Sequence, residues 1–136
     1  FLLAHIGDSR GYILEKGNLT RVTEDHSLVN ELIKEGELSP EEAEHHPKKN
    51  IITRSLGISK NSELDEEFFQ ITKNSILMLC TDGLTNMVED TKLERLLNIS
   101  ESLPDKCQRL VDEANRAGGN DNISVLLVSF DEEVKY

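Results

Sequence analysis

The sequence contains no tryptophan, and aromatic residues make up only 4% of its 136 residues. Basic residues are also scarce, because 15 Lys and Arg stand against 26 Asp and Glu, and the formal net charge is -11. A surface this acidic repels phosphate backbones and anionic bilayers, which argues against nucleic-acid binding and against docking on a membrane. Most of these carboxylates are expected to form a solvated acidic surface, whereas clustered ones could hold a divalent cation.

Cysteine and long apolar runs are scarce as well. Cys80 and Cys107 both lie in apolar patterns, which predicts small core residues rather than a disulfide framework. Free thiols fit a reducing cytoplasm, which is the expected location. No run approaches the roughly 20 apolar residues that a membrane span needs, and no signal peptide is recognisable. The chain begins with Phe1 instead of Met, as expected for a fragment or a processed product.

Apolar residues that alternate or cluster predict strands, and helical spacing predicts helices between them. The first three strands are expected to form an antiparallel meander, with Gly17-Asn18 as a tight turn. The final strand is apolar enough to be central in a sheet. Strands, then helices, then strands again predict an α+β layered domain. The expected strands are 1–6, 12–16, 19–23, 68–71, 75–80 and 122–130, and the expected helices are 25–35, 39–46, 92–98 and 102–117.

Three carboxylates stand at the ends of predicted strands. Asp8 follows the first strand, Asp82 follows the strand SILMLC, and Asp121 precedes NISVLLVSF. Each lies beside Gly or Asn, which tolerate unusual backbone dihedrals and allow a ligand to approach closely. Carboxylates that converge raise one another's pKa, and a bound cation removes that cost. Oxygen ligands without Cys or His at metal spacing indicate Mg²⁺ or Mn²⁺ rather than zinc. Asp is also a favoured turn residue, so each of the three alone could simply cap a turn.

Five short motifs stand out along the chain: GDSRGY (7–12), EDHSLV (24–29), ITRSLG (52–57), CTDGL (80–84) and GGNDNISVLLV (118–128). In this order they resemble the PPM/PP2C family of metal-dependent protein serine/threonine phosphatases, and in particular its bacterial branch. The resemblance covers the chain from Phe1 to about Phe130.

The resemblance implies part of a PP2C-like β-sandwich of antiparallel sheets flanked by α-helices, with metal ions in a cleft at one end. Asp82 and Asp121 match direct ligands of the two family metals, and Asp8 matches a ligand of a third, weaker site. Residues 28–64 match a flap-like insert beside the substrate cleft. The implied reaction is hydrolysis of phosphoserine and phosphothreonine by a metal-activated water, opposing a serine/threonine kinase in bacterial signalling. The resemblance also implies that Gly83, Asn120 and Asn122 support the metal ligands.

One family motif is absent from the sequence. The resemblance implies an N-terminal segment ending in a D-G-x-G-G-H-like word, whose Asp bridges the two metals, with a phosphate-binding Arg upstream of it; no such word occurs here. The chain is therefore expected to be the C-terminal part of a single catalytic domain, and to be inactive or nearly so alone. Open sheet edges at the missing strands favour self-association or strand exchange.

Three other functions compete with this interpretation. The first is a serine hydrolase with Ser9 as its nucleophile, because Gly7–Gly11 matches the motif G-x-S-x-G. A nucleophile elbow runs from a strand into a helix, however, and here a strand is expected on both sides of Ser9. A cysteine phosphatase needs an activated thiolate, and neither Cys80 nor Cys107 has an Arg at C-x5-R spacing. A non-catalytic pseudophosphatase or partner-binding half-domain remains open, because the bridging Asp is not in this sequence.

The remaining histidines and arginines are predicted to be structural. His5 lies inside a strand, where a packed and hydrogen-bonded side chain is expected. His26 should anchor the start of a helix, and the His45–His46 pair should be polar surface at a helix end. Arg10 and Arg54 are expected to make structural ion pairs.

Overall fold

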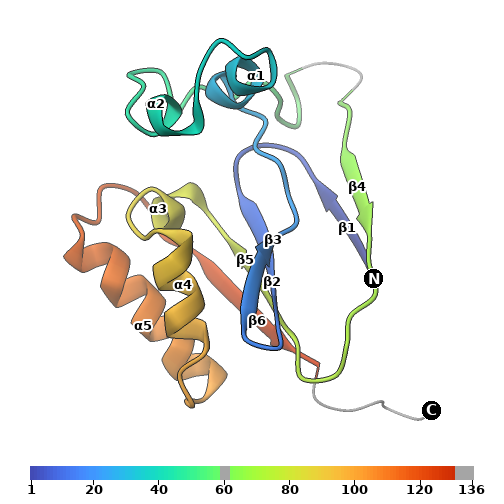
Figure 1. The fold of residues 1–136 in the computed structure, drawn as a ribbon, viewed down its shortest axis with the longest axis vertical. Coiled ribbons are helices and arrows are strands. Elements are labelled where there is room, and N and C mark those ends of the chain that lie inside the picture. Colours follow the sequence, from blue (N-terminus) through green and yellow to red (C-terminus); the bar gives the residue numbers. More distant parts are fainter. Residues whose placement is uncertain (59–61, 131–136) are drawn as a thin grey trace. The chain divides into compact units, whose positions relative to one another are not determined.

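The computed structural model describes residues 1–58 and 62–130, arranged in two compact units (Figure 1). Each unit has one antiparallel sheet with helices, which confirms the α+β class. The larger unit comprises Phe1, Ser9–Val22 and the chain from Phe69 onward, and the smaller unit comprises Leu2–Asp8 and Thr23–Phe68.

The larger unit is built on a four-stranded antiparallel sheet. Its strands lie in the order β3 (Asn18–Arg21), β2 (Arg10–Glu15), β5 (Ile76–Cys80), β6 (Val125–Ser129). The β2–β3 turn consists of Lys16 and Gly17, both at positive φ, one residue earlier than predicted. Two positive φ values give the turn a twist that matches the strands it joins, and they explain the glycine.

Helices cover one face of this sheet. They are α3 (Asp82–Thr85), α4 (Asp90–Leu97) and α5 (Leu103–Arg116), with α4 and α5 side by side in Figure 1. Apolar residues three or four positions apart on the helices meet alternate residues of the strands, which is why one continuous core forms. The core residues are Tyr12, Leu14, Met78, Cys80, Leu84, Val88, Leu93, Leu97, Leu110, Ala114 and Leu127.

The last strand is an edge strand within the described residues, so the prediction that it is central was wrong. β6 pairs with β5 from Val125 opposite Cys80 to Ser129 opposite Ile76. Only its alternate residues face the helices, and Leu126 is 55% exposed on the opposite side. A continuous apolar run therefore does not by itself identify a strand with two paired edges.

Helices form in the four predicted regions, but the first begins at Leu28 rather than at Asp25, and the short helix α3 was not predicted. Ser102 caps α5 by accepting a hydrogen bond from the Asp105 N–H, and Gly118, at φ 139°, follows its last turn. Asp90 does not cap α4, because it is the first residue of that helix. Its carboxylate instead accepts a 2.9 Å hydrogen bond from the hydroxyl of Tyr12, which is buried in the sheet. Burial also raises the pKa of Tyr12 above its ordinary value.

The smaller unit pairs two strands that are distant in sequence. β1 (Leu2–His5) is antiparallel to β4 (Asp65–Phe68), with His5 opposite Asp65. The predicted three-stranded meander was therefore wrong, because β3 and β5 occupy both edges of β2 and leave none for β1. β4 also begins three residues before the predicted 68–71 strand. Its acidic residues carry no apolar signal, although its backbone pairs normally.

Two short helices lie between these strands. α1 (Leu28–Lys34) is capped by Ser27, and α2 (Pro40–Glu44) begins with a complete capping box between Ser39 and Glu42. The start of α2 agrees with the predicted capping box, whereas α1 begins three residues after the predicted start at Asp25. These helices lie in the 28–64 insert, whose flap-like role stays a prediction. No helix in the described part of the chain is long and apolar enough to cross a bilayer.

Replacing Leu110 with Ala tests the helix-covered core. Leu110 is fully buried, so the cavity should lower the free energy of unfolding by about 2–5 kcal/mol. Gln108→Ala in the same helix is the control, because its exposed side chain should contribute less than about 0.5 kcal/mol. Urea unfolding of the full-length protein that contains this sequence measures both, and equal losses would contradict the assigned core.

Candidate metal-binding site

Hydrogen bonds made by Thr81 join the segment that carries Asp82 to the segment that carries Asp121. Thr81 directly follows β5 and donates its backbone N–H to the Ser124 carbonyl at 3.1 Å. Its side-chain oxygen accepts from the Ser124 N–H at 3.0 Å and lies 3.3 Å from the Asn122 carbonyl oxygen, to which it donates. The residue before Asp82 is thereby fixed against the residues that follow Asp121.

Gly83 allows these two segments to approach closely. A Cβ atom at this position would lie 2.2 Å from the Asn122 carbonyl oxygen and 3.0 Å from the Asn122 carbonyl carbon. No side chain fits at such distances, so the close approach requires glycine. Gly83 therefore permits the close approach of the two segments, and its supporting role toward the metal ligands stays a prediction.

Each carboxylate has a local hydrogen-bond donor. Asp121 is exposed, and its Oδ1 accepts a 2.7 Å hydrogen bond from the backbone N–H of Asn122. Asp82 is the first residue of α3, and its Oδ2 lies 3.4 Å from the side-chain amide of Asn86. Asn122 thus contacts Asp121 through its backbone N–H, and the predicted role of its side-chain amide stays a prediction. Asn86 was not predicted, although its i+4 position from Asp82 on one helix was the available signal.

The glycine pair before Asp121 ends α5. The N–H groups of Gly118 and Gly119 donate to the Asn115 and Ala114 carbonyls, and both glycines have positive φ. A Cβ at Gly118 would lie 3.3 Å from the Asn120 side-chain oxygen, so Asn120 lies close to the helix end. The predicted helix stop is confirmed, and the supporting role of Asn120 toward Asp121 stays a prediction.

Asp8 lies in the smaller unit, whereas Asp82 and Asp121 lie in the larger one. Asp8 is half-buried and directly follows Gly7, whose φ is 109°. The structure therefore brings together the segments of Asp82 and Asp121. The convergence of Asp8 with them stays a prediction.

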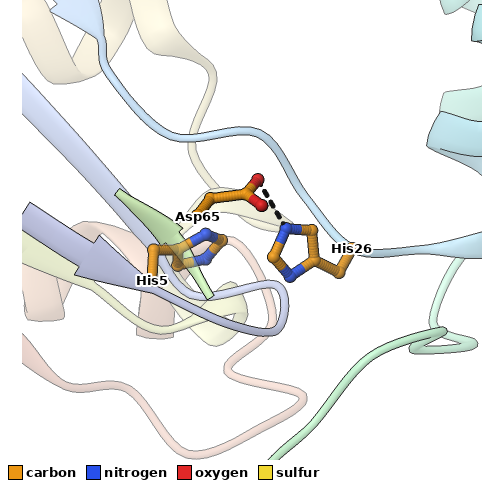
Figure 2. Close-up of side chains that lie close together, drawn as sticks. All are labelled: His5, His26 and Asp65. Atoms are coloured by element: carbon orange, nitrogen blue, oxygen red, sulfur yellow. Dashed lines mark hydrogen bonds and ion pairs between the residues drawn. The ribbon is translucent and has the colours of Figure 1, made fainter. Parts of the chain in front are cut away.

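Sequence analysis missed a polar cluster in the smaller unit, formed by His26, Asp65 and Arg54. Figure 2 shows the His26 and Asp65 side chains directed toward each other, 2.8 Å from Nε2 to Oδ2, with His5 beside them. Arg54 donates to the other Asp65 oxygen at 3.0 Å, which confirms its structural ion pair. The hydrogen bond from His26 and the charge of Arg54 lower the pKa of Asp65.

The histidines have different structural roles. His26 does not cap α1, because Ser27 does; it lies buried one residue earlier. The half-buried His5 ring lies with its centroid 4.9 Å from that of His26, in agreement with the predicted packed residue. At the end of α2, His45 is exposed, and His46 accepts a local 3.1 Å hydrogen bond from the Lys48 N–H.

Two competing sites lack the geometry that their chemistry needs. Ser9 lies between β1 and β2, so no helix follows it as a nucleophile elbow requires. Cys80 is buried in the core, and burial raises the pKa of the half-buried Cys107 thiol. Neither thiol is in the electropositive, accessible setting of a nucleophile.

The comparisons agree on the family. The model described as Stage II sporulation protein E (SpoIIE) matches residues 17–131. The serine/threonine phosphatase stp of Listeria welshimeri is 47% identical over 93% of this chain, and the protein phosphatase PhpP of Streptococcus pneumoniae is 47% identical over 97%. The chain belongs to the PPM/PP2C phosphatase family.

Solved structures of PPM/PP2C phosphatases share the fold of the chain. The Streptococcus agalactiae serine/threonine phosphatase is 44% identical, with a TM-score of 0.92 over 96% of this chain and 54% of its own. The Mycobacterium tuberculosis phosphatase PstP/Ppp is 37% identical, with a TM-score of 0.87 over 96% of this chain and 55% of its own. This PP2C chain spans about half the length of the relatives it matches, covering 50% of the Listeria protein and 54% of PhpP.

Replacing Gly83 with Ala tests the close approach of the two segments. The added methyl group would meet backbone atoms of Asn122, so the segment must move, at a cost of about 1–3 kcal/mol in the free energy of unfolding. Thr85→Ala in the same helix is the control and should cost less. Urea unfolding gives both values, and a Gly83→Ala variant as stable as the wild type would contradict the tight approach.

Proposed function

We propose that the full-length protein containing this chain hydrolyses phosphoserine and phosphothreonine in proteins, using water activated by Mg²⁺ or Mn²⁺. The observation that carries the proposal is the hydrogen-bonded junction of Thr81 with Asn122 and Ser124, which holds the segments of Asp82 and Asp121 side by side. The names of the relatives support the reaction. The catalytic domain of the phosphatase PstP, solved with two manganese ions, is 35% identical to this chain.

The donor set fits hard divalent cations. Asp82 and Asp121 offer carboxylate oxygens, and the absence of a side chain at Gly83 keeps them on adjoining segments. Asp82 and Asp121 would hold two ions, and Asp8 would contribute to a third, weaker site. When bound, such ions lower the pKa of a water molecule and neutralise charge on the phosphoryl oxygens.

The chain's own residues would orient these ligands. The Asn122 N–H fixes one oxygen of Asp121, and Asn86 lies beside Asp82. Hydrogen bonds of this kind orient a ligating carboxylate and tune its basicity. Cys80 is buried behind the strand end, and the Thr81 hydroxyl is engaged with Asn122 and Ser124, so neither group is placed to compete with water for the phosphorus.

The chain supplies only part of the expected ligand set. By family resemblance, a bridging Asp belongs to a D-G-x-G-G-H-like word, which this sequence does not contain. The 136-residue chain alone is therefore expected to have little or no activity. Rapid Mn²⁺-dependent hydrolysis of p-nitrophenyl phosphate by the isolated chain would contradict this part of the proposal.

The cellular role follows the reaction. The partners of the full-length protein would be phosphorylated proteins and an opposing serine/threonine kinase. A cytoplasmic location fits the reduced cysteines. The alternative is a non-catalytic pseudophosphatase or partner-binding half-domain. It is retained because the chain lacks the bridging Asp motif.

Substituting each predicted ligand tests the reaction. In the full-length protein, Asp82→Asn and Asp121→Asn should each lower Mn²⁺-dependent hydrolysis of a phosphothreonine peptide by at least about 100-fold, since even supporting residues of a metal site cost 10- to 100-fold. Asp105→Asn is the control, because this exposed residue lies at the start of α5.

The outcomes separate the two candidate functions. Full activity in both ligand variants would contradict the metal mechanism. Mn²⁺ binding by the wild type without any hydrolysis would instead favour the pseudophosphatase.

A further inference from the structure

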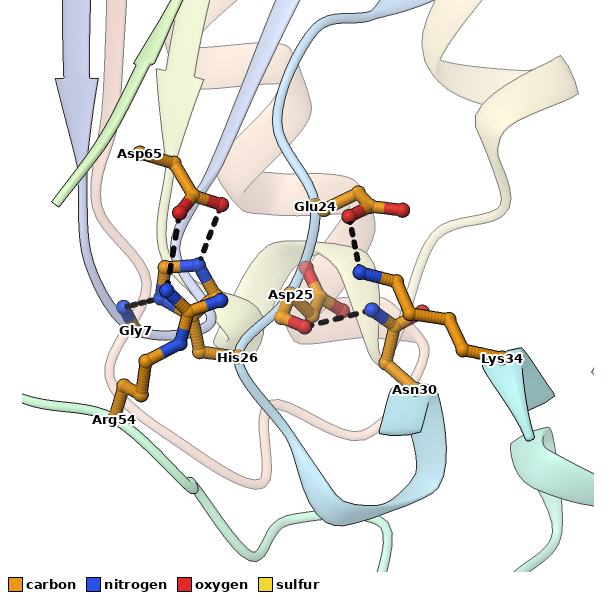
Figure 3. Close-up of polar contacts among 8 residues, drawn as sticks. All are labelled: Gly7, Glu24, Asp25, His26, Asn30, Lys34, Arg54 and Asp65. Atoms are coloured by element: carbon orange, nitrogen blue, oxygen red, sulfur yellow. Dashed lines mark hydrogen bonds and ion pairs between the residues drawn. The ribbon is translucent and has the colours of Figure 1, made fainter. Parts of the chain in front are cut away.

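His26 connects three segments of the smaller unit through its backbone and its ring, and Figure 3 shows the two ring contacts, to Gly7 and to Asp65. Its N–H donates to the Gly7 carbonyl at 2.8 Å, and its own carbonyl accepts from the Thr53 N–H at 2.8 Å. Its ring accepts from the Gly7 N–H at Nδ1, 3.0 Å away, and Nε2 lies 2.8 Å from Asp65. With 2% of its surface exposed, His26 makes these contacts away from solvent.

The Gly7 hydrogen bond determines the tautomer of His26. A backbone N–H can only donate, so Nδ1 must be without a proton. Nε2 then carries the hydrogen and donates it to Asp65. Both ring nitrogens are therefore engaged, one with the residue before Asp8 and the other with β4, and the ring orientation is fixed.

This arrangement argues against a metal ion between His5, His26 and Asp65, although their ligand atoms lie within 4.8 Å of one another. A metal at His26 Nε2 would displace the proton that donates to Asp65. The neutral ring would then need a proton on Nδ1, which already faces the Gly7 N–H. Arg54, 3.0 Å from the other Asp65 oxygen, adds an unfavourable positive charge.

The same residues hold the base of the 28–64 insert. The Leu28 N–H donates to the Ile51 carbonyl at 2.9 Å, and the residues between, Ser27 and Ile52, form an isolated bridge. Thr53 bonds to the His26 backbone, and Arg54 to Asp65. The insert base and the Asp8 loop are therefore tied to one imidazole and its carboxylate partner.

We propose that His26 is a positioning residue that sets the backbone of the Asp8 loop through Nδ1 and the base of the insert through Nε2 and Asp65. It does not touch the reacting atoms. This inference rests on the proposed function, because it takes Asp8 to be a cation ligand. A hydrogen bond to the residue beside a ligand fixes its backbone, as supporting contacts do in other metal sites.

Two substitutions separate the two contacts of the ring. In His26→Asn, the side-chain oxygen lies about where Nδ1 was and can still accept from Gly7, but Asp65 is out of reach. In His26→Gln, the longer amide can still donate to Asp65, but Gly7 loses its acceptor. Ala43→Gly is the control, because it weakens α2 in the same unit at a buried residue without touching His26.

The contact of Nδ1 with Gly7 is tested by Mn²⁺ titration of the full-length protein. Paramagnetic broadening of the Gly7 and Asp8 amide signals follows the binding of Mn²⁺ at Asp8. His26→Gln should weaken Mn²⁺ binding at Asp8 roughly 10-fold, at the lower end of the cost of losing a supporting contact. His26→Asn and Ala43→Gly should bind as the wild type does.

Amide hydrogen exchange tests the contact of Nε2 with Asp65. Loss of the Asp65 bond in His26→Asn should speed exchange at the Thr53 amide about 10-fold, because one net hydrogen bond contributes about that factor. His26→Gln should leave Thr53 closer to the wild type. This crossed pattern is not expected from a general loss of stability, which would affect both readouts in both variants.

The results distinguish this inference from the proposed function. Wild-type Mn²⁺ binding at Asp8 in His26→Gln, or equal effects of both His26 variants and Ala43→Gly, would overturn the positioning role alone. Absence of Mn²⁺ broadening near Asp8 in the wild type would contradict the cation role of Asp8 and, with it, this inference.

Discussion

The pairing of β5 on both of its edges is the constraint on which the larger unit depends. Five residues of β5 pair with β2 on one side and with β6 on the other. Its inner residues Met78 and Cys80 belong to the core, so a shift by one residue would turn them away from the helices. The same register sets Cys80 opposite Val125, which places Thr81 beside Ser124 and the two carboxylate segments next to each other.

The sequence predicted the features that have a local cause. Ser39 and Ser102 each cap a helix as predicted, because an N-cap needs only a side chain and the N–H groups that follow it. Three features without a local cause were missed. The β1–β4 pair joins distant segments, Asp90 bonds to Tyr12 instead of capping α4, and β6 lies at an edge despite its apolar run.

The candidate site shows the same division. Its glycines and Asp residues could be recognised as a set, but the reason for Gly83 could not, because the atom it avoids belongs to Asn122 across the junction. His26 was expected to serve the helix beside it in sequence. Its main ring contacts instead go to Gly7 and Asp65, which are distant in sequence. Only the fold brings those residues to the imidazole.

The order of the strands has a consequence for biosynthesis. Three helices separate β5 from β6 along the chain, so closing that pair is a long-range step that carries an entropic cost. During synthesis, Asp82 leaves the ribosome well before Asp121. The junction at Thr81 cannot form until β6 has emerged as well. The two carboxylate segments therefore come together only late in synthesis, once the C-terminal end of this unit has emerged.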